Sequence, residues 1–319
     1  MKKFDPDAAA AEGSGIYGLP FTPDDAKVVI IPVPFEATTS YGGGTSRGPA
    51  AVFEASRQVD LFDHETGRPY EAGIAMLDIP KKIVAWNGKA KKLGRRKVKA
   101  VNKISESVNA WVYETTKSML DEEKMPVVLG GDHSVPFGAH RAYVERFPGM
   151  GILHLDAHAD LREAYEGFTY SHASIFHNVM TRLPVSKLVQ VGVRDVGSGE
   201  MQFIDRSNGR IKTFFDDDLA ARKERGTAFA SLADEIVDEL PDDVYLSWDI
   251  DGLDPTLCPG TGTPVPGGLS WNEAIGLLRA IWRAKKRIVG LDLCEVAPGD
   301  SEWDANVGAR LLYKMIGFA

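Results

Sequence analysis

The chain has few of the features that mark secreted, membrane-spanning or nucleic-acid-binding proteins. Only two of its 319 residues are cysteines, Cys258 and Cys294, too few for a disulfide framework and consistent with a reducing compartment. No apolar run approaches the roughly 20 residues that would span a bilayer, and no signal-peptide pattern follows the charged N-terminus. Acidic residues outnumber basic ones, 45 to 37, giving a net charge of −8. We therefore expect a cytoplasmic protein with no membrane or nucleic-acid partner.

Short apolar and β-branched runs recur along the chain and predict strands. Several are continuously apolar, which is typical of strands buried on both faces of a parallel sheet. The eight predicted strands are 28–33, 74–77, 127–129, 152–155, 188–193, 211–215, 244–248 and 288–293. Helical spacing of apolar residues falls between them, most clearly over 101–119, over 229–240 and after Ser270, a predicted N-cap. This alternation predicts one doubly wound α/β domain over 1–319, with 1–25 as an N-terminal extension.

One segment stands out by its charge. Residues 81–99 contain nine Lys or Arg and no acidic residue. A single charge run is weak evidence for a binding partner, so we expect a solvated surface excursion.

Three clusters of carboxylates and imidazoles directly follow three predicted strands. They are Gly130–Ser134 (GGDHS), Asp156–Asp160 (DAHAD) and Asp249–Asp251 (DID). Because the carboxyl ends of parallel strands meet at one edge of a sheet, the clusters should open into one crevice. Side chains alternate in an extended segment, so the acidic and histidine residues of the last two clusters should each project to one side. Together the clusters supply six candidate metal ligands: His133, Asp156, His158, Asp160, Asp249 and Asp251.

Four ionised carboxylates in one crevice would repel one another. At about 4 Å and an effective dielectric constant of about 20, each like-charged pair costs about 4 kcal/mol. Two divalent cations, typically about 3.5 to 4 Å apart, would cancel this charge and would share bridging carboxylates. Oxygen-rich ligation with two imidazoles and no thiolate favours Mn²⁺, with Ni²⁺, Co²⁺ or Fe²⁺ as alternatives. Asp132 neighbours His133 but should point elsewhere, so we interpret it as a residue that orients a ligand.

At these residues the sequence resembles the ureohydrolase family, which includes arginases, agmatinases and related amidinohydrolases. The matching motifs are GGDHS at 130–134, DAHAD at 156–160, SWDIDGLDP at 247–255, GTP at 262–264, GGL at 267–269 and GLDLCEV at 290–296, with YGGG at 41–44 and RGP at 47–49. The resemblance implies a three-layer α/β/α fold around an eight-stranded, mostly parallel sheet, of the arginase/deacetylase type. It also implies assembly as homotrimers or homohexamers.

The resemblance further assigns the ligands of two metal ions. One ion would be held by His133, Asp156, Asp160 and Asp249. The other would be held by Asp156, His158, Asp249 and Asp251. Asp156 and Asp249 would then bridge the two ions.

The same resemblance implies hydrolysis of a guanidino compound to urea and an amine. The guanidinium carbon is a poor electrophile, and a divalent cation can lower the pKa of bound water from about 15.7 towards about 7. Glu295 matches the family glutamate that binds the guanidinium through two parallel hydrogen bonds. His172 stands where the family keeps a histidine for proton transfer to the departing amine. His172, Glu295 and Asp160 are the predicted catalytic residues, and Cys294 is predicted to be a core residue.

Two positions depart from the arginase pattern and bear on the substrate. Arg162 replaces the asparagine that binds the α-carboxylate in arginases, and Gly197 replaces the acidic residue that binds the α-amino group. The stretch 160–174 looks more like that of agmatinases, so agmatine is the predicted substrate, with putrescine and urea as products. Arg162 is also a predicted substrate-binding residue, together with Glu295 and His172. Pairing of Arg162 with Glu163, Glu166 or a substrate carboxylate remains open, and the last would favour guanidino acids such as 4-guanidinobutanoate.

Other activities stay open at this point. Within the family they are a guanidinobutyrase, an arginase, a guanidine hydrolase or a formimidoylglutamase. A mononuclear deacetylase shares the fold and part of the Asp-x-His pattern, but His133 and Asp160 supply ligands for a second metal. A catalytically silent structural subunit is the third alternative, which the intact ligand set disfavours.

Overall fold

A single eight-stranded sheet forms the centre of the protein. The computed structural model describes residues 4–319, and all strand pairs in it are parallel, in the order β2-β1-β3-β8-β7-β4-β5-β6. The strands are β1 (Val28–Val33), β2 (Ile74–Met76), β3 (Met125–Gly130), β4 (Gly151–Leu155), β5 (Lys187–Val193), β6 (Ile211–Phe215), β7 (Asp243–Asp249) and β8 (Arg287–Cys294). All eight strands predicted from the sequence are present, with ends shifted by at most two residues.

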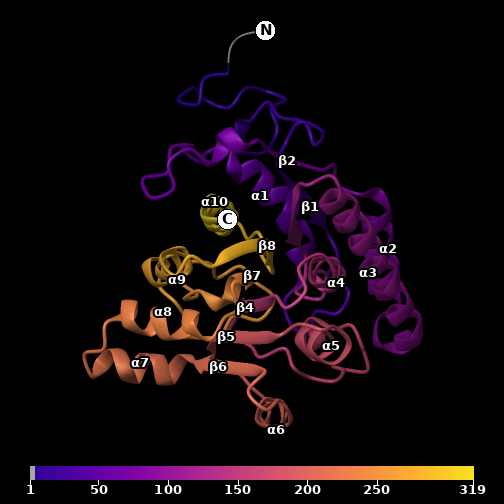
Figure 1. Ribbon diagram of the computed structural model, residues 1–319. Helices are drawn as coiled ribbons and strands as arrows, with labels where there is room; N and C mark the ends of the chain where they lie inside the picture. The colour runs from indigo at the N-terminus through magenta and orange to yellow at the C-terminus, as the bar shows by residue number, and fades with distance from the viewer. Residues whose placement is uncertain (1–3) are drawn as a thin grey trace.

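Helices cover both faces of the sheet and give three layers (Figure 1). One layer packs against the first large core cluster and contains α1 (Gly48–Ser56), α7 (Asp216–Glu224), α8 (Phe229–Asp238), α9 (Trp271–Arg283) and α10 (Trp303–Phe318). The opposite layer packs against the second and contains α2 (Lys81–Leu93), α3 (Val98–Asp121), α4 (Phe137–Arg146) and α5 (Ile175–Arg182), while α6 (Ser198–Arg206) lies at the β6 end. The predicted three-layer α/β/α fold is thus confirmed.

Local sequence signals explain where these helices begin. Ser270 caps α9 as predicted: its hydroxyl accepts from the Glu273 amide, and the Glu273 carboxylate accepts from the Ser270 amide. The apolar stripe of α3, which includes Val101, Val108 and Val112, is buried against the sheet. None of the helices among residues 4–319 is long and apolar enough to cross a membrane.

Two surface segments also contribute to the core. The nine cations of the basic segment 81–99 are all exposed, as expected of a solvated surface, and the segment forms α2, the 3₁₀ helix η4 (Gly94–Lys97) and the start of α3. Ile83 and Ala90 on its inner side are buried, so the segment packs on the protein through one face. The N-terminal extension also contributes to the core, because Ile16, Tyr17 and Leu19 are buried.

The strand order places the chemistry. β3, β8, β7 and β4 are consecutive neighbours in the middle of the sheet, although they lie far apart in the sequence. The three ligand clusters follow β3, β4 and β7, and Glu295 follows β8. Their side chains therefore meet at one edge, beyond the carboxyl ends of the central strands.

Candidate metal centre

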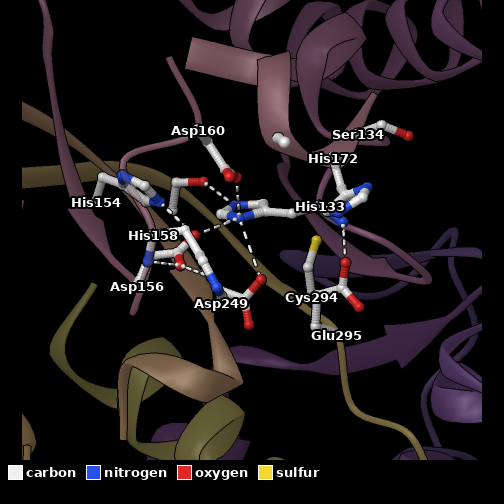
Figure 2. A network of polar contacts seen from close by, with 12 residues as sticks. His133, Ser134, His154, Asp156, His158, Asp160, His172, Asp249, Cys294 and Glu295 are labelled. Carbon is white, nitrogen blue, oxygen red and sulfur yellow. Dashed lines mark hydrogen bonds and ion pairs between the residues drawn. The ribbon is translucent and has the colours of Figure 1, made fainter. Parts of the chain in front are cut away.

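The six predicted ligands converge on a single buried cluster, with the His133 ring at its centre (Figure 2). Nδ1 of His133 lies 3.1 Å from Asp156 Oδ2, 3.4 Å from Asp160 Oδ2 and 3.4 Å from Asp249 Oδ2. These four side chains come from the ends of β3, β4 and β7. The arrangement directs one imidazole nitrogen and three carboxylates towards a common point.

A second group of ligand atoms adjoins the first. Nδ1 of His158 lies 3.2 Å from Asp156 Oδ1 and 3.3 Å from Asp251 Oδ2. The two oxygens of Asp156 therefore face different histidines, Oδ2 facing His133 and Oδ1 facing His158. Asp156 occupies the position between the two groups that a bridging carboxylate requires.

Turns, and not strand alternation, bring these residues together. Asp249 is the last residue of β7, but Asp251 lies in the 3₁₀ helix η6 (Ile250–Gly252), where Asp249 Oδ1 accepts from the Asp251 amide at 3.0 Å. Asp160 has a left-handed backbone with φ of 54°, which a non-glycine residue seldom adopts. The expectation that the ligands alternate along extended segments was therefore wrong in its geometry, although the same residues converge.

The burial and mutual charge of these carboxylates favour the binding of cations. Burial, followed by the charge of Asp156, raises the pKa of Asp160 to about 7. Burial and the Asp251 charge likewise raise the pKa of Asp249 well above its ordinary value. Oδ2 of Asp251 is buried and lies 3.3 Å from His158 Nδ1, but it accepts no hydrogen bond from any residue between 4 and 319. A donor set of four carboxylates and two imidazoles fits two divalent ions, which would compensate the charge of the buried carboxylates.

Glu295 lies at the edge of this cluster, with one carboxylate oxygen bonded and the other free. Its backbone is left-handed, with φ of 64°, and its side chain is 3% exposed. Oε1 accepts from the His133 amide at 2.9 Å, while Oε2 is buried with no partner among the described residues. Burial, and then the charge of Asp249, raise the pKa of the Glu295 carboxyl well above its ordinary value. An acceptor of this kind requires a cationic or N–H-bearing ligand.

A cavity opens beside the cluster, and His172, from η5 (His172–Ser174), lines it together with His158 and Asp160. Burial, and then the positive charge of His158, lower the pKa of His172 to about 4. Its imidazole is consequently neutral at pH 7. It can accept a proton before it donates one.

Asp132 does not contact any of the six predicted ligands through a hydrogen bond of its side chain. Its carboxylate accepts from the hydroxyl and amide of Thr38 at 2.8 and 3.2 Å, and from Ser134. The Thr38 hydroxyl in turn accepts from the His172 amide at 3.2 Å. Asp132 therefore fixes the loop that supports His172, and does not orient a ligand ring as predicted.

A row of polar residues that sequence reasoning missed crosses the sheet beneath the cluster. The row occupies one register position on four neighbouring strands: Asp292 on β8, Ser247 on β7, His154 on β4 and Gln190 on β5. All four side chains are fully buried. Each is a polar residue within an otherwise apolar strand, close to the strand's carboxyl end, and this was the signal available in the sequence.

The row supports two of the candidate ligands. Nε2 of His133 lies 3.0 Å from Ser247 Oγ, whose hydroxyl donates to Asp292 at 3.0 Å. Nε2 of His154 lies 2.8 Å from Asp156 Oδ2, and its Nδ1 lies 3.0 Å from Gln190 Nε2. With His133 donating from Nε2, its Nδ1 lone pair is left facing the carboxylates, as a metal ligand requires.

Arg162 stands in the wall of the cavity but is already paired. Its Nε lies 3.4 Å from Glu200 Oε2, and its guanidinium lies 4.6 Å from the centre of the Tyr165 ring. Among residues 4–319, neither Glu163 nor Glu166, the alternatives considered from the sequence, forms an ion pair with Arg162, and Glu166 pairs instead with Arg95. Asp195 and Glu200 also line the cavity, so its outer wall holds more negative than positive charge.

Arg194 connects another wall of the cavity to the candidate ligands. Its guanidinium donates to the carbonyl of Asp251 at 2.6 Å, to that of Gly192 at 2.9 Å and to that of Val265 at 3.0 Å. Thr263, Pro264 and Val265 line the cavity. One side chain thus holds this wall and the Asp251 turn together.

The sheet, its covering helices and a buried cluster suited to two cations define an α/β/α protein with a candidate dinuclear metal centre. The sequence model of the arginase family matches residues 26–317, and the chain belongs to that family. The N(1)-aminopropylagmatine ureohydrolase of Thermus thermophilus is 35% identical over 313 residues, covering 95% of this chain and 94% of that protein. An agmatinase of Proteus mirabilis is 31% identical over 306 residues, covering 94% and 90%.

A solved structure agrees with these relatives. The agmatine ureohydrolase of Thermoplasma volcanium superimposes with a TM-score of 0.74 at 26% identity, covering 98% of this chain and 92% of that one. The protein is accordingly a dinuclear-metal hydrolase of C–N bonds in linear amidines that cleaves a guanidino compound to urea. The deacetylase and the silent subunit are thereby set aside.

Proposed function

We propose that the substrate is a guanidino amine, and in the first instance agmatine, which is cleaved to putrescine and urea. The observation that carries this proposal is the pairing of Arg162 with Glu200. A paired guanidinium is a poor receptor for a substrate carboxylate, and the remaining charge of the wall, with Asp195, favours an ammonium group. Arginine and 4-guanidinobutanoate, which carry carboxylates, are correspondingly disfavoured.

We further propose that His133, Asp156, Asp160 and Asp249 hold one metal ion, and that Asp156, His158, Asp249 and Asp251 hold the other. Support comes from the convergence of the six side chains and from the two faces that Asp156 presents. Bound divalent ions, for which we propose Mn²⁺, supply a water activated for nucleophilic attack.

Two further residues complete the proposed site. Glu295 accepts N–H bonds from the guanidinium at its free Oε2 and so holds the reacting carbon against the metal centre. His172, neutral at pH 7, takes up a proton and delivers it to the departing amine. Glu295 thus binds and aligns the guanidinium of the substrate, whereas His172 transfers a proton to the departing amine.

A second candidate substrate is N(1)-aminopropylagmatine. The relative from Thermus thermophilus, whose name specifies this compound, covers nearly the whole chain. The longer amine carries an additional positive charge, which the acidic outer wall would also accommodate.

A urea assay tests these proposals. Manganese-loaded protein is offered agmatine, N(1)-aminopropylagmatine, arginine, 4-guanidinobutanoate and free guanidine, and kcat/KM is compared. We expect one of the two amines to lead. Preference for a carboxylate-bearing compound would contradict the charge argument.

We also propose a cytoplasmic homotrimer or homohexamer, on the basis of the family resemblance alone. Light scattering of the purified protein checks the assembly, and a monomer would contradict it.

A further inference from the structure

The basic segment 81–99 touches two loops that form the rim of the cavity. The first is the loop 36–46, which contributes Ser40 and Tyr41 to the cavity wall. The second is the tight hairpin 165–168, which contributes Tyr165. In Figure 1, α2 and α3 lie together on one side of the sheet.

Glu36 is the residue through which α2 holds the first loop. Its side chain is 4% exposed and forms an ion pair with Lys91 of α2. The same carboxylate accepts from the amides of Gly44 at 2.7 Å and Ser46 at 2.9 Å, which closes the loop on itself. Asn87, one helical turn before Lys91, accepts from the Glu36 amide at 3.0 Å.

The contact at Glu36 matters for what lies beyond it in the same loop. Tyr41 is 88% exposed at the cavity mouth, and Gly42 donates to the carbonyl of Gly262 on the opposite wall at 2.9 Å. The Thr38 hydroxyl accepts a hydrogen bond from the His172 amide. Because Asp132 fixes Thr38 independently, a displacement of the loop beyond Thr38 would alter the tyrosine at the entrance and leave the support of His172 in place.

The second loop is held from the other end of the basic segment and from the adjoining part of α3. Arg95 of η4 pairs with Glu166 at 2.5 Å, and the Asn102 side chain bonds to Gly167 O at 3.2 Å and to the Thr169 amide at 3.1 Å. Arg95 is 63% exposed, so water screens its pair and Asn102 carries more of the contact. This hairpin presents Tyr165, on which Arg162 stacks.

We propose that the basic segment, together with Asn102 in the adjoining part of α3, is a clamp for the substrate pocket. In it, Lys91 and Asn102 are positioning residues that hold the two tyrosine-bearing loops and set the affinity for the tail of the substrate. The proposal rests on the proposed function in one respect, since it takes this cavity as the substrate site. The guanidinium end of the substrate lies deeper, against Glu295, and does not depend on the clamp.

Hydrogen–deuterium exchange of the metal-loaded protein tests the clamp without any turnover. In Lys91→Met, which keeps the aliphatic stem, the amides of Gly44 and Ser46 should exchange at least about tenfold faster, because a buried carboxylate loses its counter-charge. In Asn102→Ala the peptide over 165–170 should exchange faster while the loop 36–46 stays protected. The matched control is Lys92→Met, since Lys92 forms no ion pair with the described residues.

Kinetics then test the link to the substrate. Lys91→Met should raise KM for agmatine about tenfold and leave kcat within about twofold, because the chemistry is held by other residues. Inhibition by free guanidinium, which lacks a tail, should be unchanged. The double variant Lys91→Met/Glu36→Gln should recover part of the protection, because the amide of Gln no longer leaves a buried charge unpaired.

The outcomes separate the two proposals. Unchanged exchange in Lys91→Met, or faster exchange with unchanged KM, overturns the clamp. Absence of urea release by the wild-type protein from every guanidino amine overturns the proposed function, while the exchange measurements still decide whether the segment holds the loops.

Discussion

At the scale of single residues, Glu295 concentrates three features that are costly for folding. It adopts a left-handed backbone, it is buried, and Oε2 has no partner among residues 4–319. Such features persist where the surroundings enforce them, and they gather at functional sites. The His133 amide, which donates to Oε1, is the group that holds the carboxylate in place.

The substitution Glu295→Gln should lower kcat/KM for the guanidino substrate by about 100-fold or more, because a neutral amide loses the charge-assisted bonds. Metal content, measured by elemental analysis, should stay at the wild-type value, since Glu295 is not among the proposed ligands. Loss of bound metal in this variant would assign Glu295 a different role.

Gly262 lies against the free oxygen of Glu295, and this explains why a side chain is excluded there. A Cβ atom at position 262 would lie 2.6 Å from Oε2. The variant Gly262→Ala should therefore raise KM by about tenfold, because the added methyl group occupies the space in front of the carboxylate. Gly43→Ala is the matched control, since a Cβ there meets nothing within 4 Å. Equal KM values in the two variants would contradict this.

At the scale of elements, the polar row across β8, β7, β4 and β5 is the support on which the candidate ligands rest. Ser247 lies beside Asp292 and His154 in the strand register, so the hydroxyl reaches His133 and Asp292 together. A buried row of this kind stabilises one arrangement only if every member is satisfied.

Ser247→Ala should reduce metal affinity by about 10- to 100-fold, because His133 loses the acceptor that fixes its orientation. A competing chelator dye measures the affinity. Thr213→Val removes the outermost bond of the row, to Gln190 Oε1 at 3.0 Å, and should have a much smaller effect. Similar losses in both variants would show that the row acts through general stability.

The same elements show what the sequence can and cannot predict. Strand positions were predictable because apolar runs are local features of the sequence. The ligand clusters were predictable because each directly follows a strand, and the carboxyl ends of parallel strands meet at one edge of the sheet. The partners of Thr38 and Arg162 were not, because the Thr38 contact spans 134 residues and Glu200 reaches Arg162 only through the packing of α6. The contacts of the basic segment were not predictable for the same reason, since its partners Glu36 and Glu166 lie far from it in the sequence.

At the scale of the whole molecule, protons and metal ions compete for the same cluster. Burial and then the Asp156 charge raise the pKa of Asp160 to about 7. Burial alone would lower the pKa of His158, but the Asp251 and Asp156 carboxylates raise it to about 12. Without metal, the folded protein therefore holds protons that the unfolded chain releases at lower pH.

Both shifts make the metal-free protein less stable as the pH rises. The Asp160 contribution is lost between 3.8 and about 7, and that of His158 between 6.5 and about 12. We expect chelator-treated protein to melt at a lower temperature at about pH 8 than at about pH 6, and the gain on adding Mn²⁺ to be larger at the higher pH. Calorimetry in buffers of different ionisation enthalpy should show proton release on metal binding, and an enthalpy independent of the buffer would contradict this.

The guanidinium of Arg194 has a consequence for redesign. The wall formed by Thr263, Pro264 and Val265 shares its anchor with the turn that carries Asp251, so enlarging the pocket on that side would disturb the catalytic centre as well. The loops that carry Tyr41 and Tyr165 are held by separate contacts with the outer helices, through Lys91 of α2 and Asn102 of α3 respectively. A library aimed at bulkier guanidino compounds should therefore vary the tyrosine side of the entrance, where selectivity can evolve independently of reactivity.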